Sequence, residues 1–133
     1  MINTATQKVI ATIVVGRNPS EVAITPDGTQ AYVANSGNDS VSVIDTATQK
    51  VVATIPVDST PYGVAITPNG KQAYVTGWSG EYGFVLVIDT ATRQVIATIP
   101  VGSYPDGVAI TPNGKQAYIA NNFSCLLYTS RCV

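Results

Sequence analysis

Histidine is absent from this chain of 133 residues, and only 11% of the residues are charged. Without histidine there is no imidazole for acid–base work or for binding a transition metal, and no Ser-His-Asp or Cys-His catalytic arrangement. The formal net charge of -1 gives no electrostatic reason to bind nucleic acid or an anionic membrane. The composition therefore predicts a protein without catalytic residues, a metal site, a cofactor or a nucleic-acid partner.

Long hydrophobic runs are lacking as well. The apolar segments are short and are interrupted by proline, glycine and asparagine, so we expect no membrane-spanning segment. No basic stretch followed by an apolar core opens the chain, so no signal peptide is visible. Hydrophobic residues nevertheless make up 45% of the chain, which is too many for a disordered polypeptide. These proportions indicate one folded domain of modest size.

Two motifs recur along the chain. The sequence Ile-Asp-Thr-Ala-Thr stands at residues 44–48 and 88–92, and Ile-Asn-Thr-Ala-Thr stands at 2–6. The sequence Thr-Pro-Asp/Asn-Gly starts at residues 25, 67 and 111, so successive copies lie 42 and 44 residues apart. A repeat length in the forties is typical of propellers and of solenoid arrays.

The middle repeat contains four short apolar segments, at residues 62–67, 72–76, 85–88 and 95–101. We expect these to be four antiparallel strands, A to D, of one propeller blade. Thr-Pro-Asn-Gly suits a type I turn with a left-handed glycine, and the aspartate of Asp-Thr-Ala-Thr suits an Asx turn. The residues predicted to be structural turn residues are Pro26, Gly28, Asp45, Pro68, Gly70, Asp89, Pro112 and Gly114.

Turn chemistry is also the better interpretation of the recurring aspartates as a group. The place of Asp45 and Asp89 is taken in the first copy by Asn3, which cannot act as an acid or a base. The strand-B tyrosines, at equivalent positions in each copy, are expected to be packing residues; they are Tyr32, Tyr74 and Tyr118.

The predicted fold is therefore all-β, an incomplete β-propeller with about 2.5 to 3 blades of four antiparallel strands. Its parts are a lone D strand at 9–15, blades at 20–57 and 62–101, and a partial blade at 106–121. Because one blade cannot bury both faces of its sheet, the blades must stack. A closed ring needs about four to eight blades, so we expect a truncated fragment of a ring.

Strand B reads Tyr-Val-Ala-Asn at 32–35, Tyr-Val-Thr-Gly at 74–77 and Tyr-Ile-Ala-Asn at 118–121. Together with the two turn motifs, these segments resemble the YVTN family of β-propeller repeats over residues 2–121. Gly77 departs from the family pattern, which has asparagine there. The resemblance implies a prokaryotic, surface-layer-like protein located outside the cell or on its surface. It further implies a non-catalytic binding or scaffold module. The alternative is a fragment of a lactonase-like or quinoprotein-dehydrogenase-like propeller enzyme whose active site lies in missing blades.

Residues 122–133 do not continue the repeat. Cys-Leu-Leu-Tyr-Thr-Ser at 125–130 resembles the translation of a transposase mosaic-end adaptor used in sequencing libraries, and Arg-Cys-Val resembles that of its reverse complement. On this interpretation Cys125 and Cys132 say nothing about the redox compartment. The alternative is a natural, divergent C-terminal strand.

The copies differ mainly in their B–C and D–A loops, which lie on one face of a propeller. The second B–C loop, residues 78–84, is two residues longer than the first, and most of the remaining aromatic residues fall on or near this face. Loops on a rigid scaffold are where binding residues concentrate. We therefore predict a contact site for a protein or a small ligand, made of Trp78, Tyr82, Glu81, Tyr62, Tyr104 and Asp106. In the alternative, Tyr62 and Tyr104 wedge between blades and Phe84 is buried at the start of a strand.

The predicted ends of the array leave sheet edges open. Unpaired backbone groups on an edge strand favour association with another chain. We expect self-association, in which two copies close a six-bladed ring and each lends its first D strand to the other.

Overall fold

The computed structural model describes residues 1–123 and 126–129, and they form strands and turns. The first blade has the strand order β3-β4-β5-β6, with β3 at Pro19–Ile24, β4 at Gln30–Asn35, β5 at Ser40–Asp45 and β6 at Lys50–Pro56. The second blade consists of β7 at Thr60–Ile66, β8 at Gln72–Ser79, β9 at Tyr82–Asp89 and β10 at Gln94–Val101. Neighbouring strands are antiparallel. The all-β class and the four-stranded blades are confirmed. Within the described residues, no helix is long and apolar enough to cross a membrane.

The third blade contains β11 at Pro105–Ile110, β12 at Ala117–Asn121 and β13 at Leu126–Thr129. We expected residues 122–133 to stand outside the repeat, but β13 pairs with β12 from Tyr118↔Thr129 to Asn121↔Leu126. The open edge of β12 presents a row of backbone donors and acceptors, which an extended segment satisfies whatever its side chains are. The pairing does not test whether the tail is a translated adaptor, so that interpretation stays a prediction. Cys125 and Cys132 lie outside the described residues.

The A–B turn has the same geometry in all three blades. In the first blade, the Gly28 amide donates to the Thr25 carbonyl oxygen at 2.8 Å, and Gly28 has a φ of 73°. Asp27 Oδ1 accepts from Thr25 Oγ1 at 2.7 Å and from the Thr29 amide at 3.0 Å. Asn69 Oδ1 makes the corresponding two bonds in the second blade. Either aspartate or asparagine can occupy this position, because the turn needs a side-chain oxygen as an acceptor and both residues supply one.

The C–D turn is closed by a side-chain oxygen as well. Asp45 Oδ1 accepts from the Thr48 amide at 2.8 Å, and Asp89 Oδ1 accepts from the Thr92 amide at 2.8 Å. These backbone hydrogen bonds lower the pKa of both carboxyl groups below the ordinary 3.8. Asn3 Oδ1 accepts from the Thr6 amide at 2.9 Å in the first copy. The geometry is that of the Asx turn.

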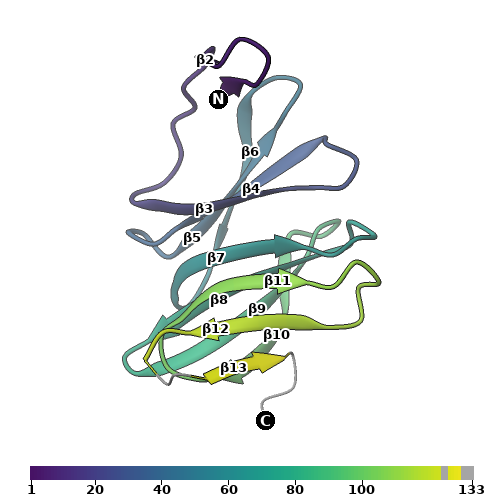
Figure 1. The fold of residues 1–133 in the computed structure, drawn as a ribbon. Helices are drawn as coiled ribbons and strands as arrows, with labels where there is room; N and C mark the ends of the chain where they lie inside the picture. The colour runs from purple at the N-terminus through teal and green to yellow at the C-terminus, as the bar shows by residue number, and fades with distance from the viewer. Residues whose placement is uncertain (124–125, 130–133) are drawn as a thin grey trace.

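The blades stack face to face, and Figure 1 shows β3, β7 and β11 side by side across the stack. Tyr32 and Val43 of the first blade pack with Val64, Val75 and Ile88 of the second in the largest apolar cluster. A second cluster joins Tyr74, Val85 and Ile99 of the second blade to Val108 and Ile119 of the third. The strand-B tyrosine of one blade thus covers the apolar face of the next. Accordingly Tyr32 is 0% exposed, whereas Tyr118 of the third blade is 37% exposed.

The N-terminal segment differs from the expected strand at 9–15. It forms a short hairpin of β1 at Ile2–Asn3 and β2 at Lys8–Val9, and residues 10–15 belong to no strand. The reason is that no described strand lies alongside residues 10–15 to pair with them. Ile13 and Val15 nevertheless pack against the apolar face of the first blade.

Candidate contact face

The loop expected at 78–84 is mostly strand. β8 continues to Ser79 and β9 begins at Tyr82, so Gly80 and Glu81 alone make the turn, with Gly80 at a φ of 62°. The additional residues therefore lengthen the β8–β9 hairpin instead of opening a loop. Trp78 pairs with Gly83 and Ser79 pairs with Tyr82. This register places the Trp78 side chain on a rigid strand.

Four aromatic rings make a continuous row across the second and third blades. The row consists of Tyr62 at the start of β7, Trp78 near the end of β8, Tyr104 before β11 and Phe123 after β12. The ring centroids of Tyr62 and Trp78 are 5.4 Å apart, those of Trp78 and Tyr104 are 5.8 Å apart, and those of Tyr104 and Phe123 are 4.8 Å apart. The planes are tilted by 38° to 53°, and separations of about 4.5–7 Å are favourable for tilted aromatic pairs. We call these four residues the aromatic row.

The aromatic row is accessible although its rings touch. Tyr62 is 38% exposed and Phe123 is 74% exposed, while Trp78 and Tyr104 are half-buried. The row and the neighbouring Asp106 and Asn122 line a shallow hollow of about 170 Å³. The rings therefore bridge the two blades, as the wedge interpretation expects for Tyr62 and Tyr104, and at the same time present a surface to solvent.

The backbone of Tyr104 has an unusual conformation. Its φ is 49°, in the left-handed region, and the equivalent Asn18 of the first copy has a φ of 48°. Asparagine adopts this conformation readily, whereas a bulky residue there is strained by about 1–3 kcal/mol. The Asn122 amide donates to the Tyr104 carbonyl oxygen at 2.9 Å and helps to hold the strained backbone. Strain of this kind gathers at functional sites.

A buried threonine fixes Asp106 beside the row. Thr76 is 0% exposed, and its Oγ1 donates to the Asp106 carbonyl oxygen at 2.6 Å and accepts from the Gly63 amide at 2.8 Å. A Cβ atom at Gly63 would overlap the Asp106 carbonyl oxygen, so glycine is required for this close approach. The hydroxyl thus ties the second blade to the third next to the hollow.

The six residues predicted for the site separate into two groups. Tyr62, Trp78, Tyr104 and Asp106 line the hollow. Tyr82 is 75% exposed, and its pairing with Ser79 places its side chain on the sheet face opposite to Trp78. Glu81 lies in the hairpin turn and does not line the hollow.

Two residues of the hollow were missed from the sequence, Asn122 and Phe123. Both residues follow the last strand-B asparagine directly, at the position where a variable B–C loop begins. That position is the sequence feature from which they could have been predicted.

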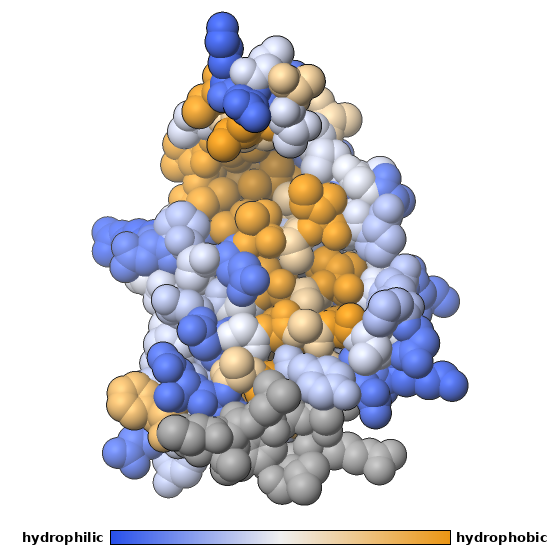
Figure 2. Space-filling view, in the orientation of Figure 1, coloured by the Kyte–Doolittle hydropathy of each residue, from blue (hydrophilic) through white to orange (hydrophobic). Residues whose placement is uncertain are grey.

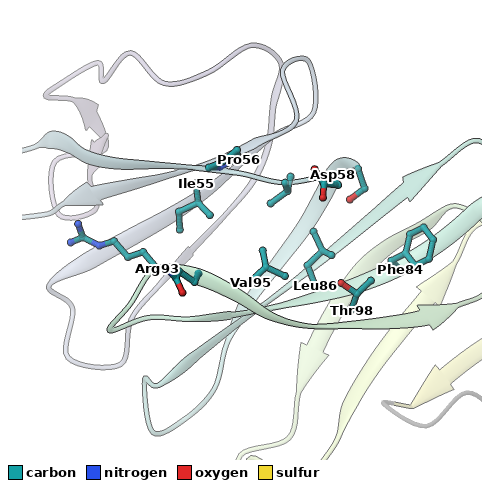
Figure 3. Close-up of a pocket in the computed structure, with 11 residues that line it drawn as sticks. Ile55, Pro56, Asp58, Phe84, Leu86, Arg93, Val95 and Thr98 are labelled. Carbon is teal, nitrogen blue, oxygen red and sulfur yellow. The ribbon is translucent and has the colours of Figure 1, made fainter.

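A larger groove lies on another side of the molecule, between the first and second blades. It has a volume of about 600 Å³. Figure 3 shows Ile55 facing Val95 and Leu86 across the groove, with Arg93 and Phe84 toward its two ends. This groove could not be predicted from the sequence, because its residues come mainly from the repeated C and D strands and the segments beside them. Its volume is within the usual range of ligand pockets, about 300–1,000 Å³.

Comparison with known proteins places the stacked blades in a family. The model of the YNCE-like β-propeller family matches residues 23–116. A search of curated protein sequences finds no match.

Solved structures with the same arrangement include Kuenenia stuttgartiensis hydrazine synthase, with 30% identity and a TM-score of 0.77 over 92% of this chain. A functionally unknown protein from Desulfotomaculum acetoxidans has 24% identity and a TM-score of 0.85 over 96%. A candidate 6-phosphogluconolactonase from Bacteroides uniformis has 21% identity and a TM-score of 0.74 over 88%.

The chain spans 36%, 41% and 37% of the lengths of these three proteins, in that order. The last two likenesses are at identities that show the shared fold alone. The family match covers most of the chain and includes the three A–B turns and the strand-B motifs at 32–35 and 74–77. The chain therefore belongs to the YNCE-like β-propeller family.

Proposed function

We propose that this chain is a non-catalytic binding or cell-surface scaffold module whose contact site is the aromatic row. The observation that carries the proposal is the contact of four accessible rings, from two blades, around a hollow that Asp106 and Asn122 also line. Tyrosine and tryptophan provide a large contact area at a low cost in conformational entropy. They are also the side chains that most often dominate binding energy at interfaces.

The chemistry of the hollow suits a partner with a flat or apolar face and a hydrogen-bond donor beside it. The rings supply the apolar surface, and the exposed Asp106 carboxylate is an acceptor at the rim. A protein side chain and a small ligand both meet this description. The resemblance to surface-layer repeats favours a location outside the cell or on its surface.

The test uses Trp78, which is the single tryptophan of the chain. Its fluorescence is followed while soluble oligosaccharides and aromatic-rich peptides are added, and each binder is retested against variants. The double variant Trp78→Ala/Tyr104→Ala is followed by calorimetry, since it lacks the fluorophore. We expect its affinity to fall at least about 30-fold, as loss of a dominant aromatic contact implies. The matched control Glu81→Ala/Tyr82→Ala should bind as the unaltered chain does. Equal affinity of the two double variants for every binder would refute the proposal.

A second candidate function is that of a piece of a propeller enzyme. The likeness to hydrazine synthase and to a candidate 6-phosphogluconolactonase supports it. The repeated strand-A segments at 22–24, 64–66 and 108–110 contain no ionisable residue, so such an enzyme would draw its catalytic groups from other positions. Hydrolysis of 6-phosphogluconolactone by this chain, above the uncatalysed rate, would favour this candidate over the first. We expect no such activity.

A further inference from the structure

The groove between the first and second blades is lined where the second blade departs from the repeat. In the first blade, the buried Asn35 Nδ2 donates to Ser40 Oγ at 3.2 Å and to Ser42 Oγ at 2.9 Å. The strand pairing gives the second blade three residues without a polar side chain at these positions: Gly77, Phe84 and Leu86. Phe84 and Leu86 line the groove. An apolar wall thus stands where the first blade has a buried polar network.

A second departure brings a carboxylate to the same groove. The segment before each blade and the end of its strand B carry a matched pair of residues. The pairs along the chain are Gly16 with Asn35, Asp58 with Gly77, and Gly102 with Asn121. Asn35 is 0% exposed, whereas Asp58 is exposed and lines the groove. At the second blade the polar side chain has therefore moved from a buried position to the groove, as a carboxylate instead of an amide.

Ser59 contributes a polar atom without a partner. Its side chain lines the groove and is 6% exposed. Among the described residues, its Oγ has no hydrogen-bond partner. Buried polar atoms of this kind are rare in folded proteins and require an explanation. A molecule in the groove with a polar group next to Ser59 would supply the missing partner.

Arg93 places a positive charge at one end of the groove. The residue after Asp/Asn-Thr-Ala-Thr is Gln7 in the first copy, Gln49 in the second and Arg93 in the third. Their φ angles are 56°, 60° and 59°, so the turn is the same and the side chain alone gains a charge. Figure 3 shows Asp58 on the side of Leu86 that is away from Arg93. The groove therefore has a cation at one end, an anion toward the other and apolar residues between them.

This combination distinguishes the groove from the other apolar surface of the molecule. Figure 2 shows apolar surface along the side on which β3 and β7 lie. The strand-A segments at 22–24 and 64–66 contain no ionisable residue, so charge gives no reason to assign a partner to that side. In the groove, the two charged ends limit the chemistry of the occupant.

We propose that the groove binds an extended peptide segment with an acidic residue at one end, an apolar middle and a basic residue at the other end. The acidic side chain meets the Arg93 guanidinium, whose planar fork suits a carboxylate. The basic side chain meets the Asp58 carboxylate, and the Ser59 hydroxyl bonds to the adjacent peptide backbone. The apolar side chains lie on Leu86 and Val95.

The dimensions of the groove agree with this occupant. Arg93 and Thr98 both line it, and five residues of strand β10 span about 16 Å. An extended peptide of about five residues has the same length. A fatty acid would also satisfy Arg93, but its methyl end would lie against Asp58 and Ser59 and would leave both without a partner. The second polar end therefore favours a peptide.

The first experiment measures binding of the end-capped peptide Glu-Leu-Val-Leu-Lys to the full chain by calorimetry. The reference peptide Ser-Leu-Val-Leu-Ser has the same apolar middle and no charge. We expect the charged peptide to bind at least about tenfold more tightly, because hydrogen bonds between charged groups are stronger than neutral ones. Equal affinity of the two peptides, no binding of either, or tighter binding of dodecanoate than of the charged peptide would overturn the proposal.

Charge reversal locates the peptide in the groove. Arg93→Gln introduces the glutamine of the other copies and should lower the affinity for Glu-Leu-Val-Leu-Lys about tenfold. Arg93→Glu should instead prefer Lys-Leu-Val-Leu-Lys. The matched control Lys71→Gln removes an exposed cation from the A–B turn of the second blade and should leave the affinity unchanged. An Arg93→Glu chain that still prefers the peptide with glutamate, or an equal loss in Lys71→Gln, would overturn the proposal.

Ser59→Ala separates binding from a structural role. The substitution removes a hydroxyl that is buried without a partner, so the melting temperature of the free chain should not fall. The affinity for Glu-Leu-Val-Leu-Lys should fall about fivefold, the effect of one lost hydrogen bond. A lower melting temperature with an unchanged affinity would show that the hydroxyl serves the fold and would overturn the proposal.

Discussion

Replacement of Thr76 by valine should expose how strongly one hydroxyl holds the second and third blades together. The side chain is 0% exposed, and valine has nearly the same shape. The substitution removes the donor to the Asp106 carbonyl oxygen, 2.6 Å away, and the acceptor of the Gly63 amide, 2.8 Å away. Both partners stay where they are because their strands are paired elsewhere in the sheets.

The magnitude follows from the two groups left without a partner. A buried polar group that loses its hydrogen bond is destabilising by about 1–3 kcal/mol. Gly63 is buried, so its amide should contribute an amount within this range, while the Asp106 carbonyl is partly accessible and should contribute less. We expect the free energy of unfolding to fall by about 2–4 kcal/mol in total.

The assay is urea unfolding of the purified chain, followed by circular dichroism, with Thr76→Ser as the control. Serine retains the hydroxyl and loses one methyl group, a change of about 1 kcal/mol. The order of stability should therefore be threonine, then serine, then valine. A valine variant as stable as the unaltered chain, or one more stable than the serine variant, would show that the hydroxyl does not tie the blades.

Three further predictions concern the turns and the departure from the repeat. Gly28→Ala should lower the free energy of unfolding by about 1–2 kcal/mol, because φ is 73° while no atom lies within 4 Å of the new Cβ; a larger loss in urea unfolding would contradict this. Gly77→Asn, which introduces the asparagine of the other two copies, should destabilise the chain because its Cβ would lie 2.6 Å from Ser59 Oγ and 3.0 Å from the Thr60 carbonyl oxygen. Ser59→Gly should restore part of the lost stability, and no recovery in thermal unfolding would count against the clash with Ser59. Asp45 and Asp89 have a lowered pKa in the folded chain, so the stability that they contribute is present above 3.8 and is lost as the pH falls through the folded values. Their asparagine variants should show a weaker loss of stability in acid, and an unchanged acid profile would contradict the assignment.

The constant parts of the repeat were predictable because they depend on local chemistry. A proline, an acceptor side chain and a glycine at fixed spacing define the A–B turn, and the structure has that turn, with φ of 73° at Gly28 and 71° at Gly70. The all-β class and the blade order follow from those turns and from the β-branched segments between them. Long-range pairing was not needed to infer them.

The variable parts were predictable only as a region. Trp78 and Tyr82 are both aromatic and lie four residues apart, but the hairpin extends past Trp78 and places the two side chains on opposite faces. Whether an insertion lengthens a hairpin or opens a loop depends on register, which composition does not reveal. The expected strand at 9–15 was wrong for a related reason, since a strand needs a partner and none is described beside it.

The covering of each blade by the tyrosine of the one before it has a consequence for how the chain unfolds. Tyr32 is sealed between two complete blades, Tyr74 faces a three-stranded one, and Tyr118 faces outward. In a linear array, stability is the sum of nearest-neighbour contacts, so each junction opens separately once its outer neighbour frays. Amide hydrogen exchange should therefore be slowest around Tyr32 and fastest in the third blade.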